Sequence, residues 1–500
     1  MKKKPNIILV LIDDLGYGDL SCTNSDSKIR TKNIDRLGAE GMICTDAHAS
    51  SAVCSPSRYA LLTGRYNWRS RLKKTVLPGT SPPLIEEGRL TLPEMLKQCG
   101  YKTACVGKWH LGMDWATRPE VQPSYELFDK ISDRPDLGLD YTKPIKNGPN
   151  AKGFDYFFGM TASLDQAPYV FIENDLPQSY PTRIIGSEDC DHSMPSSMFL
   201  CDKGPASEDF DVKQAVPACD EKVLELIDGF AKQDEPFFLY YPSLAVHGPL
   251  VPADEYVGKS GIGAYGDFVL QVDGFVGKLM DKLEEKELAD DTIVIFTSDN
   301  GCSTIVDFAA LAKFGHHPSY HFRGAKADIW EGGHRIPYII KWPEYIKPGS
   351  ICDETFCLVD MFATFAEVNS YQYPDEAAED SISVLSLFEG KKEPIRDYLV
   401  HHALFGYFSI RHKDWKLELC AGSGSFNYPV EGKDTEDMPP MQLYNLRDDI
   451  AEKTNLCNQY PEIVEELKAV LTNYITNGRS TPGKPQKNFP CENWPGLNWL

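Results

Sequence analysis

The sequence lacks several features that would each point to a particular class of protein. No uninterrupted apolar run approaches the roughly 20 residues of a membrane-spanning helix, so no membrane span is expected. Basic residues are scarce: 51 Lys and Arg against 73 Asp and Glu give a net charge of −22, which argues against non-specific nucleic-acid binding. None of the 14 cysteines forms a CxxC pair of the kind found in zinc sites and thioredoxin-like proteins.

What remains is the composition of a large globular protein. The 500 residues are 42% hydrophobic and 25% charged. A chain of this length can form two to four domains and can bury an active site. The apolar run from Ile7 to Ile12 is too short for a signal peptide and leads into Asp13 and Asp14. If one of the 14 cysteines is catalytic, thirteen remain, and an odd number cannot all pair. Reduced thiols and a cytoplasmic location are therefore favoured, or a periplasmic or secreted location if a signal has been removed.

Short apolar runs alternate with helical patterns along most of the chain. Strands are expected at Asn6–Ile12, Thr103–Val106, Phe237–Tyr241 and Thr292–Thr297, with an amphipathic helix from Phe268 to Leu283. This order predicts an α/β fold with a mainly parallel sheet sandwiched by helices. Because ligands collect at the carboxyl ends of such strands, the polar residues that follow them are the candidate site.

Two segments depart from the pattern. Residues 113–220 are rich in Pro, Gly, Asp and aromatics and read as a loop-rich insertion that carries substrate specificity. From residue 396 to 500 the pattern changes to short alternating strands (Leu404–Arg411 and Trp415–Leu419), a helix near Pro461–Tyr474 and a Pro-rich tail. We therefore expect a catalytic domain over 1–395 and a smaller α+β C-terminal subdomain over 396–500.

The strongest local signal is Cys54-Ser55-Pro56-Ser57-Arg58, followed by Leu62-Thr63-Gly64-Arg65. A cysteine at the start of a Pro-initiated helix lies where the helix dipole favours negative charge. The pattern resembles the signature of the type I sulfatases, whose cysteine is converted to formylglycine by a sulfatase-maturing enzyme. The resemblance implies an alkaline-phosphatase-like fold, with one Ca²⁺ bound by Asp13, Asp14, Asp299, Asn300 and the modified Cys54.

The same resemblance supplies positive charges and proton carriers. It assigns catalytic roles to Arg58, to Lys108 and His110 in Gly-Lys-Trp-His-Leu-Gly, to His247 in Ala-Val-His-Gly-Pro, and to Lys326 before Trp330-Glu331-Gly332-Gly333-His334-Arg335. The implied nucleophile is a hydroxyl of hydrated formylglycine, with Asp299 as its proton acceptor. His247 would protonate the leaving oxygen and His110 would deprotonate the second hydroxyl.

Other histidines carry weaker signals. His316, His317 and His321 lack the spacing of a transition-metal site, although His321 precedes the Lys326 motif and is a candidate substrate contact. His401, His402 and His412 belong to the C-terminal subdomain, and the sequence does not decide whether His402 reaches the cleft.

The segments around Gly153–Gly159 and Ser163–Asp175 resemble the N-acetylgalactosamine-6-sulfatase branch of the arylsulfatases. This implies exo-acting hydrolysis of 6-O-sulfated N-acetylgalactosamine or galactose in host or algal glycans, with Asp165 and Tyr169 as candidate substrate residues. The partner would be a sulfated mono- or oligosaccharide, which the net charge of −22 favours over a long polyanion. Two alternatives stay open: a phosphomonoester or phosphonate hydrolase of the same superfamily, and a non-catalytic sulfoglycan-binding protein.

Overall fold

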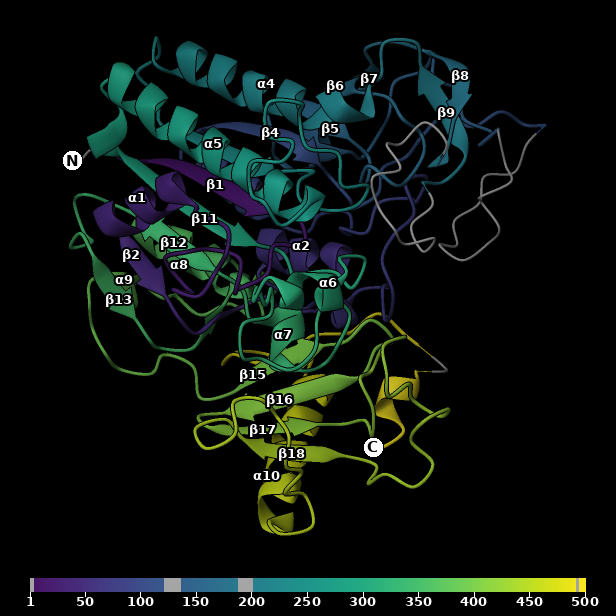
Figure 1. The fold of residues 1–500 in the computed structure, drawn as a ribbon, viewed down its shortest axis with the longest axis vertical. Helices are drawn as coiled ribbons and strands as arrows, with labels where there is room; N and C mark the ends of the chain where they lie inside the picture. The colour runs from purple at the N-terminus through teal and green to yellow at the C-terminus, as the bar shows by residue number, and fades with distance from the viewer. Residues whose placement is uncertain (1–3, 121–135, 188–200, 492–493) are drawn as a thin grey trace.

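The centre of the molecule is a ten-stranded mixed sheet (Figure 1). The structure, a computed structural model, describes residues 4–120, 136–187, 201–491 and 494–500. In spatial order the strands are β13 (Ser350–Cys352), β2 (Met42–Cys44), β12 (Tyr338–Lys341), β11 (Thr292–Ser298), β1 (Asn6–Ile12), β10 (Phe237–Pro242), β4 (Lys102–Lys108), β5 (Tyr156–Met160), β6 (Ile172–Glu173) and β7 (Leu176–Pro177).

The five strands β11, β1, β10, β4 and β5 run parallel, and antiparallel strands flank them on both sides. Every residue of β1 is buried. Helices cover both faces of the parallel centre of the sheet, so neither face of the strand is exposed to water and polar and apolar residues do not alternate along it. The four strands expected from the sequence are all present, and the predicted fold class is confirmed.

The segment 113–220 differs in part from the expected loop insertion. Its described part contains β5, which extends the central sheet beside β4, and the first residues of helix α4 (Ala215–Phe230). The strand is short and interrupted by Gly159, which weakens its sequence signal. A Cβ at Gly159 would lie 1.9 Å from the carbonyl oxygen of Gly107, so close packing against β4 explains this glycine.

Helices form two layers over the sheet. Helix α5 (Ala264–Glu285), the predicted amphipathic helix, lies beside α4 and α1 (Lys32–Glu40) on one face (Figure 1). Helices α2 (Cys54–Thr63), α3 (Leu92–Gln98) and α8 (Met361–Val368) pack together on the other. Shorter described elements are β3 (Ala47–His48), β8 (Pro181–Ile185), β9 (Gly204–Ser207), α6 (Phe308–Lys313), α7 (Glu331–His334), β14 (Phe356–Cys357) and α9 (Leu385–Phe388).

The C-terminal part forms a separate antiparallel sheet below the main one (Figure 1). Its strands are β15 (Leu399–His402), β16 (Phe408–His412), β17 (Trp415–Glu418) and β18 (Gln442–Asn445), and helix α10 (Pro461–Thr476) packs on β16. The predicted strand from Leu404 begins only at Phe408. Residues 403–407 form a turn instead, in which Gly406 has a φ of 87° and the Ala403 amide donates to the carbonyl of Tyr407.

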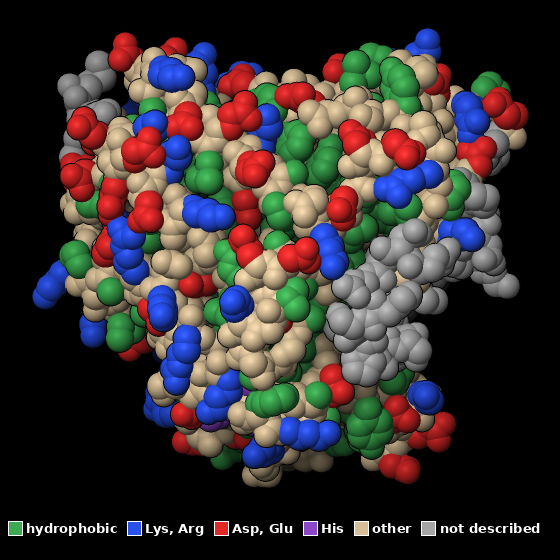
Figure 2. All heavy atoms as spheres, turned by 45° about the horizontal axis from the view of Figure 1, so that its top comes forward, with side chains coloured by type: hydrophobic (Ala, Val, Ile, Leu, Met, Phe, Trp, Pro, Cys, Tyr) green, Lys and Arg blue, Asp and Glu red, His purple; other side chains and the backbone are tan. Residues whose placement is uncertain are grey.

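Charged side chains of both signs lie on the surface. On the face drawn in Figure 2, the described acidic and basic side chains are interspersed over the helices and loops. Among the described residues, no helix is both long and apolar enough to cross a membrane.

Candidate active site

Strands β1 and β11 bring two polar pairs together at one edge of the sheet. They are paired in parallel with Ile12 opposite Ser298, so Asp13 and Asp14 emerge beside Asp299 and Asn300, as the sequence predicts. One ligand atom from each of Asp13, Asp14, Cys54 and Asp299 can be chosen so that all four lie within 4.8 Å of one another. All of these side chains are buried.

The donor set fits a hard divalent cation. Asn300 donates from Nδ2 to Asp14 Oδ1 at 2.7 Å, and its own Oδ1 is buried without a hydrogen-bond partner among the described residues. This unpartnered amide oxygen and the three neighbouring carboxylates are together oxygen ligands of the kind that Ca²⁺ prefers. Asp13, Asp14, Asp299 and Asn300 can therefore hold such an ion.

Cys54 is the first residue of helix α2, and its Sγ lies 3.4 Å from Asp13 Oδ1. Val53 before it is extended, so the chain turns into the helix at the cysteine. Burial and the negative charge of Asp13 raise the pKa of the Cys54 thiol above its ordinary value. The unmodified side chain is therefore held as a thiol and is a weak nucleophile.

Three cations neutralise these carboxylates: Lys108 and Arg58 are buried, and Lys326 is partly buried. Lys108 Nζ lies 2.6 Å from Asp13 Oδ2, Lys326 Nζ lies 2.8 Å from Asp14 Oδ2, and Arg58 donates twice to Asp299 Oδ2 at 2.9 and 2.7 Å. Burial alone would raise the pKa of Asp13, but Lys108 and other nearby cations hold it well below its usual range. The predicted sulfate-binding cations thus meet at the predicted cation site.

Two histidines border the cluster with defined orientations. His110, at a φ of 56°, donates from Nε2 to the Leu77 carbonyl at 2.7 Å, so its buried Nδ1 carries a lone pair and has no partner among the residues described. Burial and then Lys108 and Arg58 lower its pKa well below 6.5. His247 donates from Nδ1 to the Gly248 carbonyl at 2.8 Å, and its Nε2 lies 3.7 Å from Asp14 Oδ2.

The candidate substrate residues lie in different surroundings. Asp165 is close to the site, with Oδ1 3.9 Å from His247 Nδ1. Tyr169 is fully buried and donates to the Asp202 carbonyl at 2.7 Å, so its hydroxyl is already used within its own loop. His321 is exposed, with its ring 3.8 Å from that of Tyr320.

Two further histidines of the sequence analysis have partners within the fold. His316 Nε2 lies 2.9 Å from Asp19 Oδ1. His402 is buried in the C-terminal subdomain, with Nδ1 3.3 Å from Asn67 Nδ2 and its ring beside Phe408.

Sequence reasoning missed the groups that orient the two candidate catalytic histidines. These are the backbone carbonyls of Leu77 and Gly248. In the same way, the backbone carbonyl of Lys108 accepts a hydrogen bond from Arg58 Nη1 at 3.0 Å. A carbonyl is common to every residue, so no side-chain signal could have marked them.

The profile of the sulfatase family matches residues 5–370, which is more than half of the sequence. The chain belongs to the sulfatase family. It is 34% identical over 504 residues to an N-acetylgalactosamine-6-O-sulfatase of Bacteroides thetaiotaomicron, covering 95% of this chain and 94% of the relative. It is also 27% identical to the N-acetylgalactosamine-6-sulfatase of Homo sapiens, with 99% and 89% of the two chains covered. The protein is thus a sulfuric ester hydrolase by family.

Solved structures agree with this assignment. A Bacteroides thetaiotaomicron protein described with the metabolism of multiple glycosaminoglycans matches with a TM-score of 0.81 and 32% identity, covering 94% of this sulfatase and 99% of that chain. A phosphonate monoester hydrolase of Agrobacterium radiobacter matches with a TM-score of 0.57 and 17% identity, over 94% and 95% of the two chains. The second likeness shows a shared fold alone.

Proposed function

We propose that this sulfatase removes 6-O-sulfate from terminal N-acetylgalactosamine or galactose residues of glycans. The observation that carries this proposal is the 34% identity to an N-acetylgalactosamine-6-O-sulfatase over 95% of the chain. The segment 113–220, part of which lies outside the described residues, would contribute the specificity loops. Asp165, close to His247, is its best-placed polar candidate for a sugar hydroxyl.

Asp13, Asp14, Asp299 and Asn300 would hold one Ca²⁺, and Cys54 would be matured to formylglycine. These two groups would supply a Lewis acid for the sulfate and an oxygen nucleophile for its sulfur. The support is the orphaned Asn300 Oδ1, the three surrounding carboxylates and the Cys54 motif. A sulfatase-maturing enzyme is the partner that this modification requires.

Fixed cations would bind the sulfate group. Lys108 and Lys326 each have an ammonium group beside the proposed cation site, and both are already desolvated by burial. Preorganised charge in such a site stabilises a developing negative charge without solvent reorganisation. Arg58, with two hydrogen bonds to Asp299, would keep that carboxylate oriented and add a third positive charge.

Proton transfer would be divided between two histidines and Asp299. His247 Nε2 faces the site, since Nδ1 donates to Gly248, and would give a proton to the departing sugar oxygen. Asp299 would accept the proton of the attacking hydroxyl at residue 54. His110 stays neutral, and its Nδ1 lone pair would accept the proton that releases the sulfate.

The proposal is tested with protein co-expressed with a sulfatase-maturing enzyme. The mass of the peptide that carries Cys54 is measured first, and a formylglycine mass is expected. Sulfate release is then measured on 6-sulfated N-acetylgalactosamine, galactose and N-acetylglucosamine, with 4-sulfated N-acetylgalactosamine as the positional control. We expect the two galacto-configured 6-sulfates to be the best substrates, and Cys54→Ala to be inactive on all of them.

Three results would contradict the proposal, each at a different level. Preferred release from the 4-sulfated sugar would overturn the position while leaving the sulfatase chemistry intact. Hydrolysis of phosphate or phosphonate esters in preference to every sulfate ester would favour the rival hydrolase. An unmodified Cys54 and no turnover, with the maturing enzyme active on a control substrate, would favour a binding protein.

A further inference from the structure

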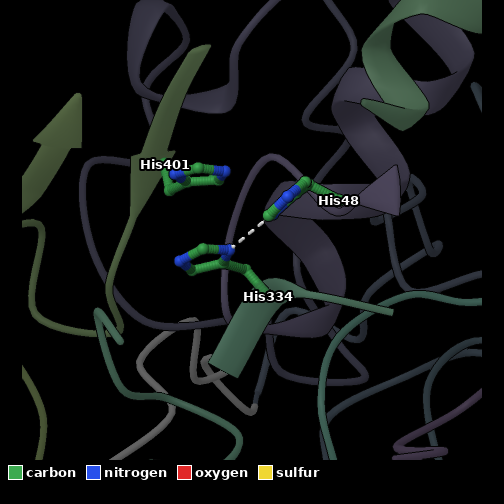
Figure 3. Close-up of side chains that lie close together, drawn as sticks. All are labelled: His48, His334 and His401. Atoms are coloured by element: carbon green, nitrogen blue, oxygen red, sulfur yellow. Dashed lines mark hydrogen bonds between the residues drawn. The ribbon is translucent and has the colours of Figure 1, made fainter. Parts of the chain in front are cut away.

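Three buried histidines meet where the C-terminal subdomain contacts the catalytic domain. His48 comes from β3, His334 from α7 and His401 from β15, and all three side chains are fully buried. Figure 3 shows the rings of His334 and His401 lying parallel, with His48 directed at them from the side. One nitrogen from each ring can be chosen so that the three lie within 4.8 Å of one another.

The outer nitrogens of two rings each lie beside an oxygen that can only accept. His48 Nε2 lies 2.8 Å from Asp46 Oδ1, and His334 Nε2 lies 3.1 Å from the carbonyl oxygen of Ile329. When each of these nitrogens carries the hydrogen of its ring, both Nδ1 atoms are left with lone pairs, because a neutral imidazole has only one N–H.

These two lone pairs face each other. His48 Nδ1 and His334 Nδ1 are 3.1 Å apart, a distance at which two acceptors repel unless a cation lies between them. The separation is close to the N···N edge of about 3.3 Å in a tetrahedral site with Zn–N bonds of about 2.0 Å.

His401 offers a third unsatisfied nitrogen. Its Nδ1 lies 3.2 Å from Ser409 Oγ, and its Nε2 is buried with no hydrogen-bond partner within the described part of the chain. Its ring stacks on that of His334 at 3.6 Å and 12°, so binding of one ion by both requires His401 to tilt out of the stack.

Two cations also approach these outer nitrogens. Lys416 Nζ is 3.1 Å from His334 Nε2 and donates to Glu452 Oε1 at 2.8 Å. Arg411 Nη1 is 3.2 Å from His48 Nε2 and donates to Asp46 Oδ1 at 2.9 Å. A hydrogen bond from either cation would move the hydrogen of that ring to Nδ1 and produce an N–H···N bond between His48 and His334. Arg335 also binds Asp46.

We propose that His48, His334 and His401 form a structural site for one Zn²⁺ that joins the two parts of the molecule. The carboxylate, carbonyl and hydroxyl on the outer nitrogens are the partners that orient metal-binding histidines in proteins. The competing explanation is a proton shared by His48 and His334. A hydrogen bond between the two rings needs no metal, so the zinc content of the protein separates the two explanations. The site is independent of the proposed sulfate-ester chemistry.

The test measures metal content of the full chain expressed with zinc in the medium and then treated with EGTA. Mass spectrometry of the metals should find about one Zn per chain in the wild type. X-ray absorption at the zinc edge should show three nitrogen ligands at about 2.0 Å. His401→Gln should lose the zinc, whereas Asp13→Asn in the catalytic cluster and His412→Gln on the neighbouring strand β16 should retain it.

The proposal is overturned if the wild type contains less than about a tenth of an equivalent of zinc. It is equally overturned if zinc is lost with Asp13→Asn and kept with His401→Gln, because the ion would then occupy the catalytic cluster. If His401→Gln does not fold, the absorption spectrum of the wild type decides, since oxygen-dominated coordination would exclude the three histidines.

Discussion

Each active-site cation is paired with one carboxylate of the proposed Ca²⁺ site: Lys108 with Asp13, Lys326 with Asp14, and Arg58 with Asp299. A buried charge without a partner is costly, so the pairs keep the cluster stable before substrate arrives. The same cations are then in place for the negatively charged sulfate group of a substrate.

Replacing Lys326 by alanine should lower kcat/KM by about 10²–10³, the usual effect of losing one preorganised donor to a developing negative charge. The measurement is sulfate release at saturating Ca²⁺, so that a weaker cation site does not account for the loss. Lys313→Ala, an exposed lysine on α6, is the matched control and should be unchanged. A loss below threefold for Lys326→Ala would exclude a role in binding the sulfate.

His247→Ala should slow substrates with poor leaving groups more than those with good ones. A general acid matters in proportion to the basicity of the departing oxygen, which is high for a sugar alcohol and low for 4-nitrophenol. We expect a loss of about 10²-fold or more on the sugar sulfate and less than about 10-fold on 4-nitrophenyl sulfate. Equal losses would show that His247 has another role.

At the scale of single elements, helix α4 and strand β10 meet through a partly buried polar pair. Tyr241 on β10 donates to Asp220 Oδ1 on α4 at 2.6 Å. Burial raises the pKa of Asp220 to about 7, since the Tyr241 hydrogen bond and Lys278 only partly offset it and Glu221 adds to it. A carboxyl whose pKa is higher in the folded state favours folding while protonated, so this contribution is lost as the pH rises from about 4 to above about 7.

Asp220→Asn should therefore stabilise the protein at alkaline pH and not at acidic pH. The amide oxygen can still accept from Tyr241, while the buried charge is gone. Between pH 4.5 and 8.5 the free energy of unfolding of the variant should gain about 1–2 kcal/mol on that of the wild type, a value discounted for the partial exposure of Asp220.

Urea unfolding at the two pH values measures this difference. Glu225→Gln, which removes an exposed carboxylate elsewhere on the same helix, should follow the wild type at both. A difference between Asp220→Asn and the wild type that stays constant with pH would show that Asp220 titrates normally.

At the scale of the whole molecule, buried ion pairs join the C-terminal sheet to the catalytic domain. Lys416 on β17 contacts Glu331 of the catalytic domain and Glu452 of its own subdomain, and all three side chains are fully buried. Arg69 likewise binds Asp380 through Nε at 2.7 Å and the Tyr474 carbonyl of α10 through Nη1 at 2.9 Å. The two parts should therefore unfold together.

Lys416→Met should lower the free energy of unfolding by about 3–5 kcal/mol, because it leaves buried carboxylates without their cation. Calorimetry should still show one transition, shifted to lower temperature. Lys453→Met, an exposed lysine of the same subdomain, should change the free energy of unfolding by less than about 0.5 kcal/mol. A loss below 1 kcal/mol for Lys416→Met would mean that the network is not needed for stability.

The sequence by itself determined the four central strands, the reaction class and most of the candidate site. Continuous apolar runs set β1, β4, β10 and β11, and the polar residues at their ends could only meet at one edge of a parallel sheet. The Cys54 motif and the cations were identified without coordinates, because each lies in a local pattern that resembles the sulfatase family.

Only the tertiary structure decided which groups without a local signal come together. Strand β5 was not predicted, because it is a strand through its pairing with β4 and not through its own sequence pattern. Backbone carbonyls set the orientations of His110 and His247, and a backbone carbonyl leaves no signal in the sequence. His48, His334 and His401 lie hundreds of residues apart or in unrelated segments, and their convergence depends on how the C-terminal sheet docks. Long-range packing determines such contacts, and periodic patterns in the sequence do not predict them.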